Sequence, residues 1–296
     1  MVFSNRWGLA MVLVVMNTTA TGCDFILGRK LNPRYCKAHL SDPDCKRAFP
    51  DAGPDEPTTC TGDEQCPPPL VCDLGATMMC VQCTMNEHDA CTGTTPICID
   101  RTCQKCTKHA QCLASNVCLP DGACADEAQV AYVQAGGSGS ACTKLAPCGT
   151  LDAGVQTNKP IVKIASGTIA DDKATTIDGK AVMILADPGA KLTRTNNGVI
   201  LDVRNTGADA QIFDLEITGG IGIANAVITM PSGGAPRLTL TRVTVDLNQG
   251  IGISSAAGIL TISRSTIERN LSGGLSIAEA QFDITNSYIV NNGSPS

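Results

Sequence analysis

The chain of 296 residues carries a net charge of −6, which argues against a nucleic-acid-binding surface or a polybasic membrane patch. Only 3% of the residues are aromatic, so a globular helical core is disfavoured, whereas the many Gly, Ala, Val, Ile and Thr residues favour thin, repetitive β-structure. The length allows about two domains.

Residues 1–22 have the features of a signal peptide. Arg6 precedes the apolar run Trp7–Met16, which is too short to span a membrane but matches a signal-peptide core. The small residues Ala20-Thr21-Gly22 stand directly before Cys23. This arrangement resembles a bacterial lipobox, in which the cysteine is acylated and becomes the first residue of the mature protein. The resemblance implies an exported lipoprotein that is anchored in a membrane by lipid attached to Cys23. Secretion without lipid and a buried free thiol are the alternatives.

Residues 23–59 are predicted to be a tether, because they are rich in proline and charge and include the linker Asp51–Pro57. Cys36 and Cys45 are expected to close one small loop within it. Such a tether holds the following domains away from the lipid. The protein is expected at the outer membrane or cell surface, or at a periplasmic membrane face. The choice between inner and outer membrane stays open.

Residues 60–124 contain a 23-residue repeat that begins at Cys60, Cys83 and Cys106, each followed by Thr, and each unit has four cysteines. Units this short bury too little apolar surface to fold alone, so we predict two disulfides in each, contributing about 2–4 kcal/mol apiece. Several connectivities fit the spacing, and we favour first-to-third with second-to-fourth. The cysteines predicted to form disulfides are Cys36, Cys45, Cys60, Cys66, Cys72, Cys80, Cys83, Cys91, Cys98, Cys103, Cys106, Cys112, Cys118, Cys124, Cys142 and Cys148.

A zinc site is the alternative for this region, because Cys80-Val-Gln-Cys83 and Cys103-Gln-Lys-Cys106 have the spacing of a four-cysteine site. However, both pairs join the last cysteine of one unit to the first of the next, so the repeat itself creates them. Export also favours disulfides, and we therefore expect no metal. His88 and His109 lie in corresponding loops between cysteines and are interpreted as solvated.

The pattern changes completely after Cys124. We predict a strand over Gln129–Val133, a Gly/Ser loop, a short helix capped by Thr150, and a strand over Pro160–Ile169. This order resembles the opening of right-handed parallel β-helix proteins of the pectate-lyase-like group. The resemblance implies that the helix covers the first coil.

A 22-residue repeat supports the same fold independently of that resemblance. The apolar pattern is present in Leu240-x-x-Val243-x-Val245, Ile262-x-x-Ser265-x-Ile267 and Ile284-x-x-Ser287-x-Ile289, and one longer step earlier in Ile212-x-x-Leu215-x-Ile217. A second short strand is predicted at Ile221–Ile223, Ile251–Ile253 and Leu275–Ile277. A repeat of this length predicts a solenoid. The predicted fold class is therefore mainly β, with a right-handed parallel β-helix of about five coils over residues 125–296 preceded by small disulfide-rich modules. A β-sandwich is the rival fold.

Asn248, Asn270 and Asn292 share one position of the repeat and are predicted to form a structural ladder, because Asn tolerates tight turns and its amides bond to each other. Met230–Pro236 is predicted to be a protruding spacer loop. The last coil has no predicted cap, so we expect either a longer gene product or a partner that covers it.

Alignment of the repeats places four residues in one column on the outer face of the stacked strands: Asp214, Arg242, Arg264 and Asn286. The resemblance to enzymes that cleave acidic polysaccharides implies a uronate-binding or lyase-like groove there. A solvated charge ladder is favoured instead, because only Asp214 and Glu216 supply carboxylates nearby. We assign no catalytic residue and no cofactor. The predicted function is non-catalytic display for adhesion or for binding a glycan or a surface protein, with a polysaccharide lyase or glycoside hydrolase as the alternative.

Overall fold

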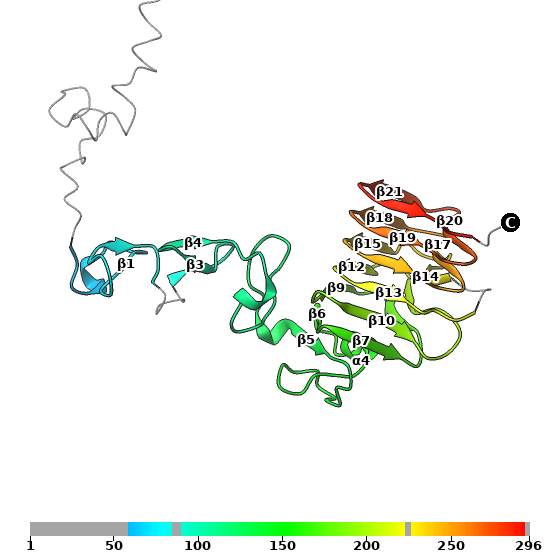
Figure 1. Cartoon of the computed structure of the whole chain (residues 1–296), viewed down its shortest axis with the longest axis horizontal. Coiled ribbons are helices and arrows are strands. Elements are labelled where there is room, and N and C mark those ends of the chain that lie inside the picture. The colour runs from blue at the N-terminus through cyan, green and yellow to red at the C-terminus, as the bar shows by residue number, and fades with distance from the viewer. Residues whose placement is uncertain (1–58, 85–89, 223–225, 294–296) are drawn as a thin grey trace, which may run out of the picture. The chain divides into compact units, whose positions relative to one another are not determined.

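The computed structural model describes residues 59–84, 90–222 and 226–293 (Figure 1). It divides into two compact units, Met1–Val81 and Gln82–Ser296. The predicted signal peptide, the lipidation site Cys23, the tether with Cys36 and Cys45, and His88 all lie outside the described residues. In the part of the chain that is described, no helix has the length and apolar character needed to cross a bilayer.

The described part of the first unit, residues 59–81, forms one cysteine module. A short 3-10 helix, η2 (Asp63–Gln65), precedes the antiparallel strands β1 (Val71–Cys72) and β2 (Cys80–Val81). The Gln65 side chain accepts the backbone N–H of Thr61 at 2.8 Å, which closes the turn after the first cysteine. Two disulfides brace the module, and their cysteines supply most of its small buried core.

The second unit begins with two further modules, which contain the hairpin β3 (Ile97–Ile99) and β4 (Thr102–Gln104) and the 3-10 helix η4 (His109–Gln111). Every module pairs its first cysteine with its third and its second with its fourth, which is the connectivity favoured from the sequence. The closely spaced cysteines at the module boundaries therefore belong to separate bridges. The disulfides are Cys60–Cys72, Cys66–Cys80, Cys83–Cys98, Cys91–Cys103, Cys106–Cys118, Cys112–Cys124 and, beyond the modules, Cys142–Cys148.

The remainder of the second unit is a parallel β-solenoid of about five turns, which confirms the predicted fold class (Figure 1). Its strands stack into three parallel sheets. The first sheet contains β5 (Val130–Val133), β6 (Ile161–Ile164), β9 (Ala181–Ala186), β12 (Asp209–Phe213), β15 (Arg237–Thr241), β18 (Ile259–Ser263) and β21 (Gln281–Thr285). The second contains β7 (Gly167–Asp171), β10 (Ala190–Arg194), β13 (Glu216–Thr218), β16 (Thr244–Asp246), β19 (Thr266–Glu268) and β22 (Tyr288–Val290). The third contains β8 (Thr175–Asp178), β11 (Leu201–Arg204), β14 (Ala226–Met230), β17 (Ile251–Ser255) and β20 (Gly273–Ile277).

Aliphatic side chains fill the solenoid in columns. Ile184, Ile212, Leu240 and Ile262 occupy one register position in successive coils, and all four are fully buried. Each buried side chain of this size stabilises the fold by about 1.5–3 kcal/mol relative to exposure. The column stays in register although the coils differ in length, since its successive residues are 28, 28 and 22 positions apart.

A short helix, α4 (Leu151–Gln156), covers the first coil. Its apolar residues Leu151 and Val155 are buried in the solenoid core. Thr150 caps the helix by accepting the N–H of Ala153, as predicted. The buried carboxylate of Asp171 accepts the backbone N–H groups of residues 151 and 152. The first N–H groups of a helix have no acceptor within the helix, and here a residue of the solenoid provides one.

An asparagine column runs along one corner of the solenoid. The side-chain N–H of Asn248 donates to Oδ1 of Asn270 at 2.8 Å, and that of Asn270 donates to Oδ1 of Asn292 at 3.0 Å. Asn248 and Asn270 are almost completely buried, and each also donates to a strand carbonyl. Buried amides must be hydrogen-bonded, so this column has a structural role.

Two strand predictions are wrong in position. The segment predicted as one strand, Pro160–Ile169, forms β6 and β7 on either side of Ala165–Ser166, because the chain turns a solenoid corner there. Ile221 lies outside any strand, and Ile223 is not described; the strand that pairs with Ile251 begins at Ala226 instead. This coil is longer than the next one, because Ile212 and Leu240 are 28 residues apart whereas Leu240 and Ile262 are 22 apart, so its apolar interior residues come later in the chain than the 22-residue pattern predicts.

Candidate ligand-binding groove

The third cysteine module packs on the outer face of the first sheet. Tyr132, Leu185 and Phe213 point outward in one column of that sheet, yet each is at most 8% exposed. They form an apolar cluster with Val117, which lies within the module, and with Ala125, which directly follows its last cysteine. In the following coils, the same column contains Thr and Ser. The covered surface therefore ends where the outward residues become polar.

Hydrogen bonds hold the same contact. The Tyr132 hydroxyl donates to the carbonyl of Ser115 at 2.6 Å. Burial raises the pKa of Tyr132 to about 12, so the hydroxyl keeps its proton at neutral pH. Lys144 donates to the carbonyls of Leu113 and Ala114 at 3.0 and 2.5 Å. The third module and the solenoid are thus joined by an apolar core and by polar contacts at its edges.

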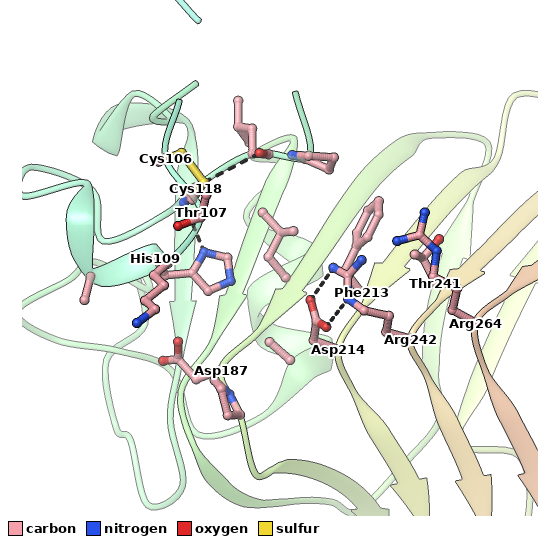
Figure 2. A pocket seen from close by; sticks show the side chains of 17 residues that line it. Cys106, Thr107, His109, Cys118, Asp187, Phe213, Asp214, Thr241, Arg242 and Arg264 are labelled. Carbon is pink, nitrogen blue, oxygen red and sulfur yellow. Dashed lines mark hydrogen bonds and ion pairs between the residues drawn. A yellow bond between two sulfur atoms is a disulfide. The ribbon is translucent and has the colours of Figure 1, made fainter. Parts of the chain in front are cut away.

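A groove of about 950 Å³ lies between this module and the solenoid (Figure 2). One wall comes from the module, and the other comes from the ends of strands β9, β12, β15 and β18 and the turns after them. The module contributes Cys106, Thr107, Lys108, His109, Ala110, Cys118, Leu119 and Pro120. The solenoid contributes Leu185, Ala186, Asp187, Pro188, Phe213, Asp214, Thr241, Arg242 and Arg264.

The column predicted from the repeat does lie together in this wall, but its location differs from the prediction. Asp214, Arg242 and Arg264 are not on a strand face; each is the residue directly after a strand of the first sheet. Their φ angles of 62°, 56° and 49° are left-handed. The chain needs this conformation to turn from the first sheet into the second, so the side chains project from the solenoid corner.

The carboxylates of the wall are both paired. Asp214 forms two bonds with the Arg242 guanidinium, at 2.5 and 2.7 Å, and these bonds raise the pKa of Arg242 (Figure 2). Asp187 is 2.5 Å from Nζ of Lys163, which is only 3% exposed. Burial lowers the pKa of Lys163, and the bond to Asp187 opposes that shift. Neither carboxylate contributes an unbalanced negative charge to the groove.

His109 is part of the module wall, so its interpretation as a solvated loop residue is wrong. Its Nδ1 accepts the backbone N–H of Cys118 at 3.0 Å. In the first module, Asp63 occupies the same place, three residues after the first cysteine, and its Oδ1 accepts the N–H of Cys72 at 2.6 Å. An accepting Nδ1 requires a neutral ring with its proton on Nε2. Burial, and then the charge of Lys163, lower the pKa of His109 accordingly.

Sequence reasoning missed Lys108, Asp187 and Phe213 as groove residues. One usable signal was present: Leu185 and Phe213 are apolar at outward positions, where the later coils have Thr or Ser. Apolar residues on the outer face of a strand indicate that another element covers them. That signal identifies the covered coils, but it does not identify the covering segment.

Comparisons with known proteins add no relative: scans of protein-family models, curated proteins and solved structures each found no match.

Proposed function

We propose that this protein is an exported, membrane-anchored lipoprotein that displays a glycan-binding groove and does not catalyse a reaction on its ligand. Export is supported by the disulfides of the described region, because such bonds persist in oxidising compartments. The lipobox-like segment before Cys23 supports the anchor. The tether and modules would then hold the solenoid away from the lipid.

The observation that carries the binding proposal is the groove between the third module and the solenoid corner. Its walls are rigid, since disulfides brace one side and stacked strands build the other. Rigid walls lower the entropy lost when a ligand binds. Polar groups such as the hydroxyls of Thr107 and Thr241 stand beside apolar surface from Leu119. A sugar ring presents the same mixture of hydroxyl groups and apolar faces.

The charge pairing favours binding over catalysis. A lyase or hydrolase needs carboxylates or bases that are free to exchange a proton with the substrate. Asp214 is held by both of its oxygens on Arg242, and Asp187 is held by Lys163. Glu216, the other carboxylate considered from the sequence, bonds Lys191 at 2.7 Å on the second sheet. Asp214 and Asp187 are therefore suited to shaping the wall, and Glu216 lies outside the groove.

A glycan array probed with the intact protein tests this proposal. Thr241→Tyr places a bulky ring inside the groove, whereas Thr239→Tyr places the same ring on the same outward face of β15, outside the groove. We expect glycan binding by the natural protein and by Thr239→Tyr, and its loss in Thr241→Tyr. Binding to no glycan, or equal binding by both variants, would contradict the proposal. Release of unsaturated or reducing sugar ends from a bound polysaccharide would favour the enzymatic alternative.

The anchor is tested separately by mass spectrometry of the mature N-terminus. An acylated Cys23 as the first residue is expected. An unmodified N-terminus or an uncleaved chain would remove the lipoprotein part of the proposal and leave the groove unaffected.

A further inference from the structure

We propose that Lys163 and Asp187 form a covalent cross-link, in which the lysine side-chain nitrogen is joined to the aspartate side-chain carbon as an amide. Lys163 lies in β6, and Asp187 directly follows β9 in the neighbouring coil of the solenoid. The bond therefore ties two adjacent coils together beneath the third cysteine module. It depends on the burial of the amine and on the fixed position of the carboxyl group, and glycan binding has no part in it.

Lys163 occupies an unusual place for a charged side chain. It stands between Tyr132 and Leu185 in the outward column that the third module covers, and it is only 3% exposed. Tyr132 and Leu185, with Phe213 further along the column, belong to the apolar cluster under the module. The lysine side chain is thus enclosed by an interface that is otherwise mainly apolar.

The hydrogen bonds of Lys163 leave its ammonium group incompletely satisfied. An ammonium has three N–H donors, and a buried polar group without a partner is costly. Within the described part of the chain, Asp187 is the only residue that accepts a hydrogen bond from this side chain, from Nζ to Oδ1 at 2.5 Å. A buried ion pair offsets the cost of removing both charges from water only when the remaining donors are also bonded. An amide has no charge and a single N–H, so the cross-link removes most of this cost.

Asp187 is held in place by its backbone. Its N–H donates to the carbonyl of Ile164 in β6 at 2.9 Å. Residues 187–190 form a turn that is closed by a backbone hydrogen bond of 3.0 Å, with Pro188 second and Gly189 third at a φ of 82°. Proline and a left-handed glycine at these positions are typical of a type II turn. A fixed corner therefore presents the carboxyl group to the amine, and fixed geometry of this kind replaces much of the entropic part of a reaction barrier.

The reaction is a condensation that balances within the pair. One proton passes from the Lys163 ammonium to the Asp187 carboxylate, which leaves an amine and a carboxylic acid. The amine nitrogen forms a bond to the carboxyl carbon, one carbon–oxygen bond breaks, and the oxygen leaves as water with one proton from the acid and one from the amine. No oxidant, reductant or cofactor is consumed. Asp187 lines the groove and is 27% exposed, so the water has a route out (Figure 2).

The surroundings of Lys163 favour the reactive amine. Burial, the largest influence, lowers the pKa of Lys163, whereas the hydrogen bond to Asp187 and the charges of Asp187 and Asp214 raise it. A lowered pKa increases the fraction of lysine that carries a free electron pair on nitrogen.

The neutral state of His109 is compatible with the cross-link. The bond removes the charges of Lys163 and Asp187 together, and these charges shift the pKa of His109 in opposite directions. Burial lowers that pKa by more than either charge changes it. His109 therefore remains a neutral acceptor for the N–H of Cys118 in the cross-linked protein.

The chain contains a matched pair that should not react. Lys191 and Glu216 also join adjacent coils, 25 residues apart in the chain, with Nζ 2.7 Å from Oε1. Their side chains are 44% and 28% exposed, so water stabilises the separate charges. Both pairs bring an amine and an acid to a similar distance, and the burial of the lysine is what distinguishes them.

Peptide mapping by mass spectrometry tests the cross-link on the intact, folded protein, whose disulfides are reduced before digestion. We expect a branched tryptic peptide that contains Lys163 and Asp187, one water lighter than the sum of its two parts, with no cleavage after Lys163. Cleavage after Lys191 and an unmodified Glu216 are expected in the same digest. Lys163→Arg keeps a positive charge beside Asp187, but its guanidinium stays protonated and does not attack the carboxyl carbon. This variant should give the Asp187 peptide at full mass and a melting temperature lower by about 5–10 °C, because loss of a cross-link frees the unfolded chain as loss of a disulfide does.

The natural protein decides the question by itself. Cleavage after Lys163 together with an Asp187 peptide of full mass overturns the proposal, whether or not the variant folds. A branched peptide that joins Lys191 to Glu216 in equal yield overturns the assignment to a buried site, because proximity alone would then cause the reaction. Glycan binding is measured separately, so failure of either result leaves the other standing.

Discussion

Mild acid is expected to loosen the third cysteine module from the solenoid through His109. The neutral ring accepts the N–H of Cys118, and it lies between the module and a solenoid surface that contains the buried Lys163. Protonation places a second positive charge beside Lys163 and turns the accepting Nδ1 into a donor that faces another N–H. Asp187 and Asp214 also face the ring and partly offset this repulsion.

The lowered pKa of His109 determines how docking of the module depends on pH. When the module leaves the solenoid, His109 returns toward its ordinary pKa of 6.5, so the undocked state binds more protons. Docking is therefore at full strength above about pH 6.5 and weakens as the pH falls below it, by at most about 1.4 kcal/mol per pH unit for one proton. The loss ends once the docked ring itself is protonated. Leaving the buried N–H of Cys118 without an acceptor costs about 1–3 kcal/mol, and this cost is one source of the weaker docking in acid.

Hydrogen exchange of residues 106–124, corrected for the intrinsic rate and compared between about pH 7.5 and pH 5, measures the effect. Protection of this module should fall in acid, while the solenoid segment 237–263 keeps its protection. His109→Asn provides the control, because its amide oxygen accepts the same N–H and does not titrate. If the module in the natural protein and in His109→Asn loses equal protection in acid, His109 is not the group responsible and the reasoning is refuted.

Three further changes test the packing. Phe213→Thr should weaken docking of the third module by about 1.5–3 kcal/mol, seen as lower hydrogen-exchange protection of the module; unchanged protection would show that the apolar cluster does not hold it. Replacing Cys106 and Cys118 by Ser should reduce the free energy of unfolding of the module by about 2–4 kcal/mol in a denaturant titration and weaken glycan binding, and retention of both properties would count against a disulfide-braced wall. Asn270→Ala should destabilise the solenoid by about 1–3 kcal/mol for each buried group left unpaired, and by more than Asn292→Ala at the end of the described ladder; equal losses would contradict cooperative stacking.

The solenoid and the division into four-cysteine modules were accessible from the sequence because both depend on short-range periodicity, whereas the spacing left several disulfide pairings open and only the structure selects first-to-third with second-to-fourth. A 22-residue spacing forces Leu240 onto Ile262 whatever else the chain does, and a 23-residue spacing returns each module to the same arrangement of cysteines. The same reasoning was wrong where a coil changed length. Ile221 has the residue pattern of a strand, but the added residues of that coil move the strand to Ala226.

The groove required the tertiary structure, because its two walls are far apart in the chain and no repeat relates the cysteine module to the solenoid corner. The repeat places Asp214 and Arg242 in one column, but only the left-handed corner turns them outward to bond each other across 28 residues. The position of His109 against Lys163 depends on which coils the third module covers. That choice follows from a few outward apolar residues such as Leu185 and Phe213. Local periodicity thus determined the stack, whereas long-range burial of an apolar patch decided where the module docks and left a charged groove at its edge.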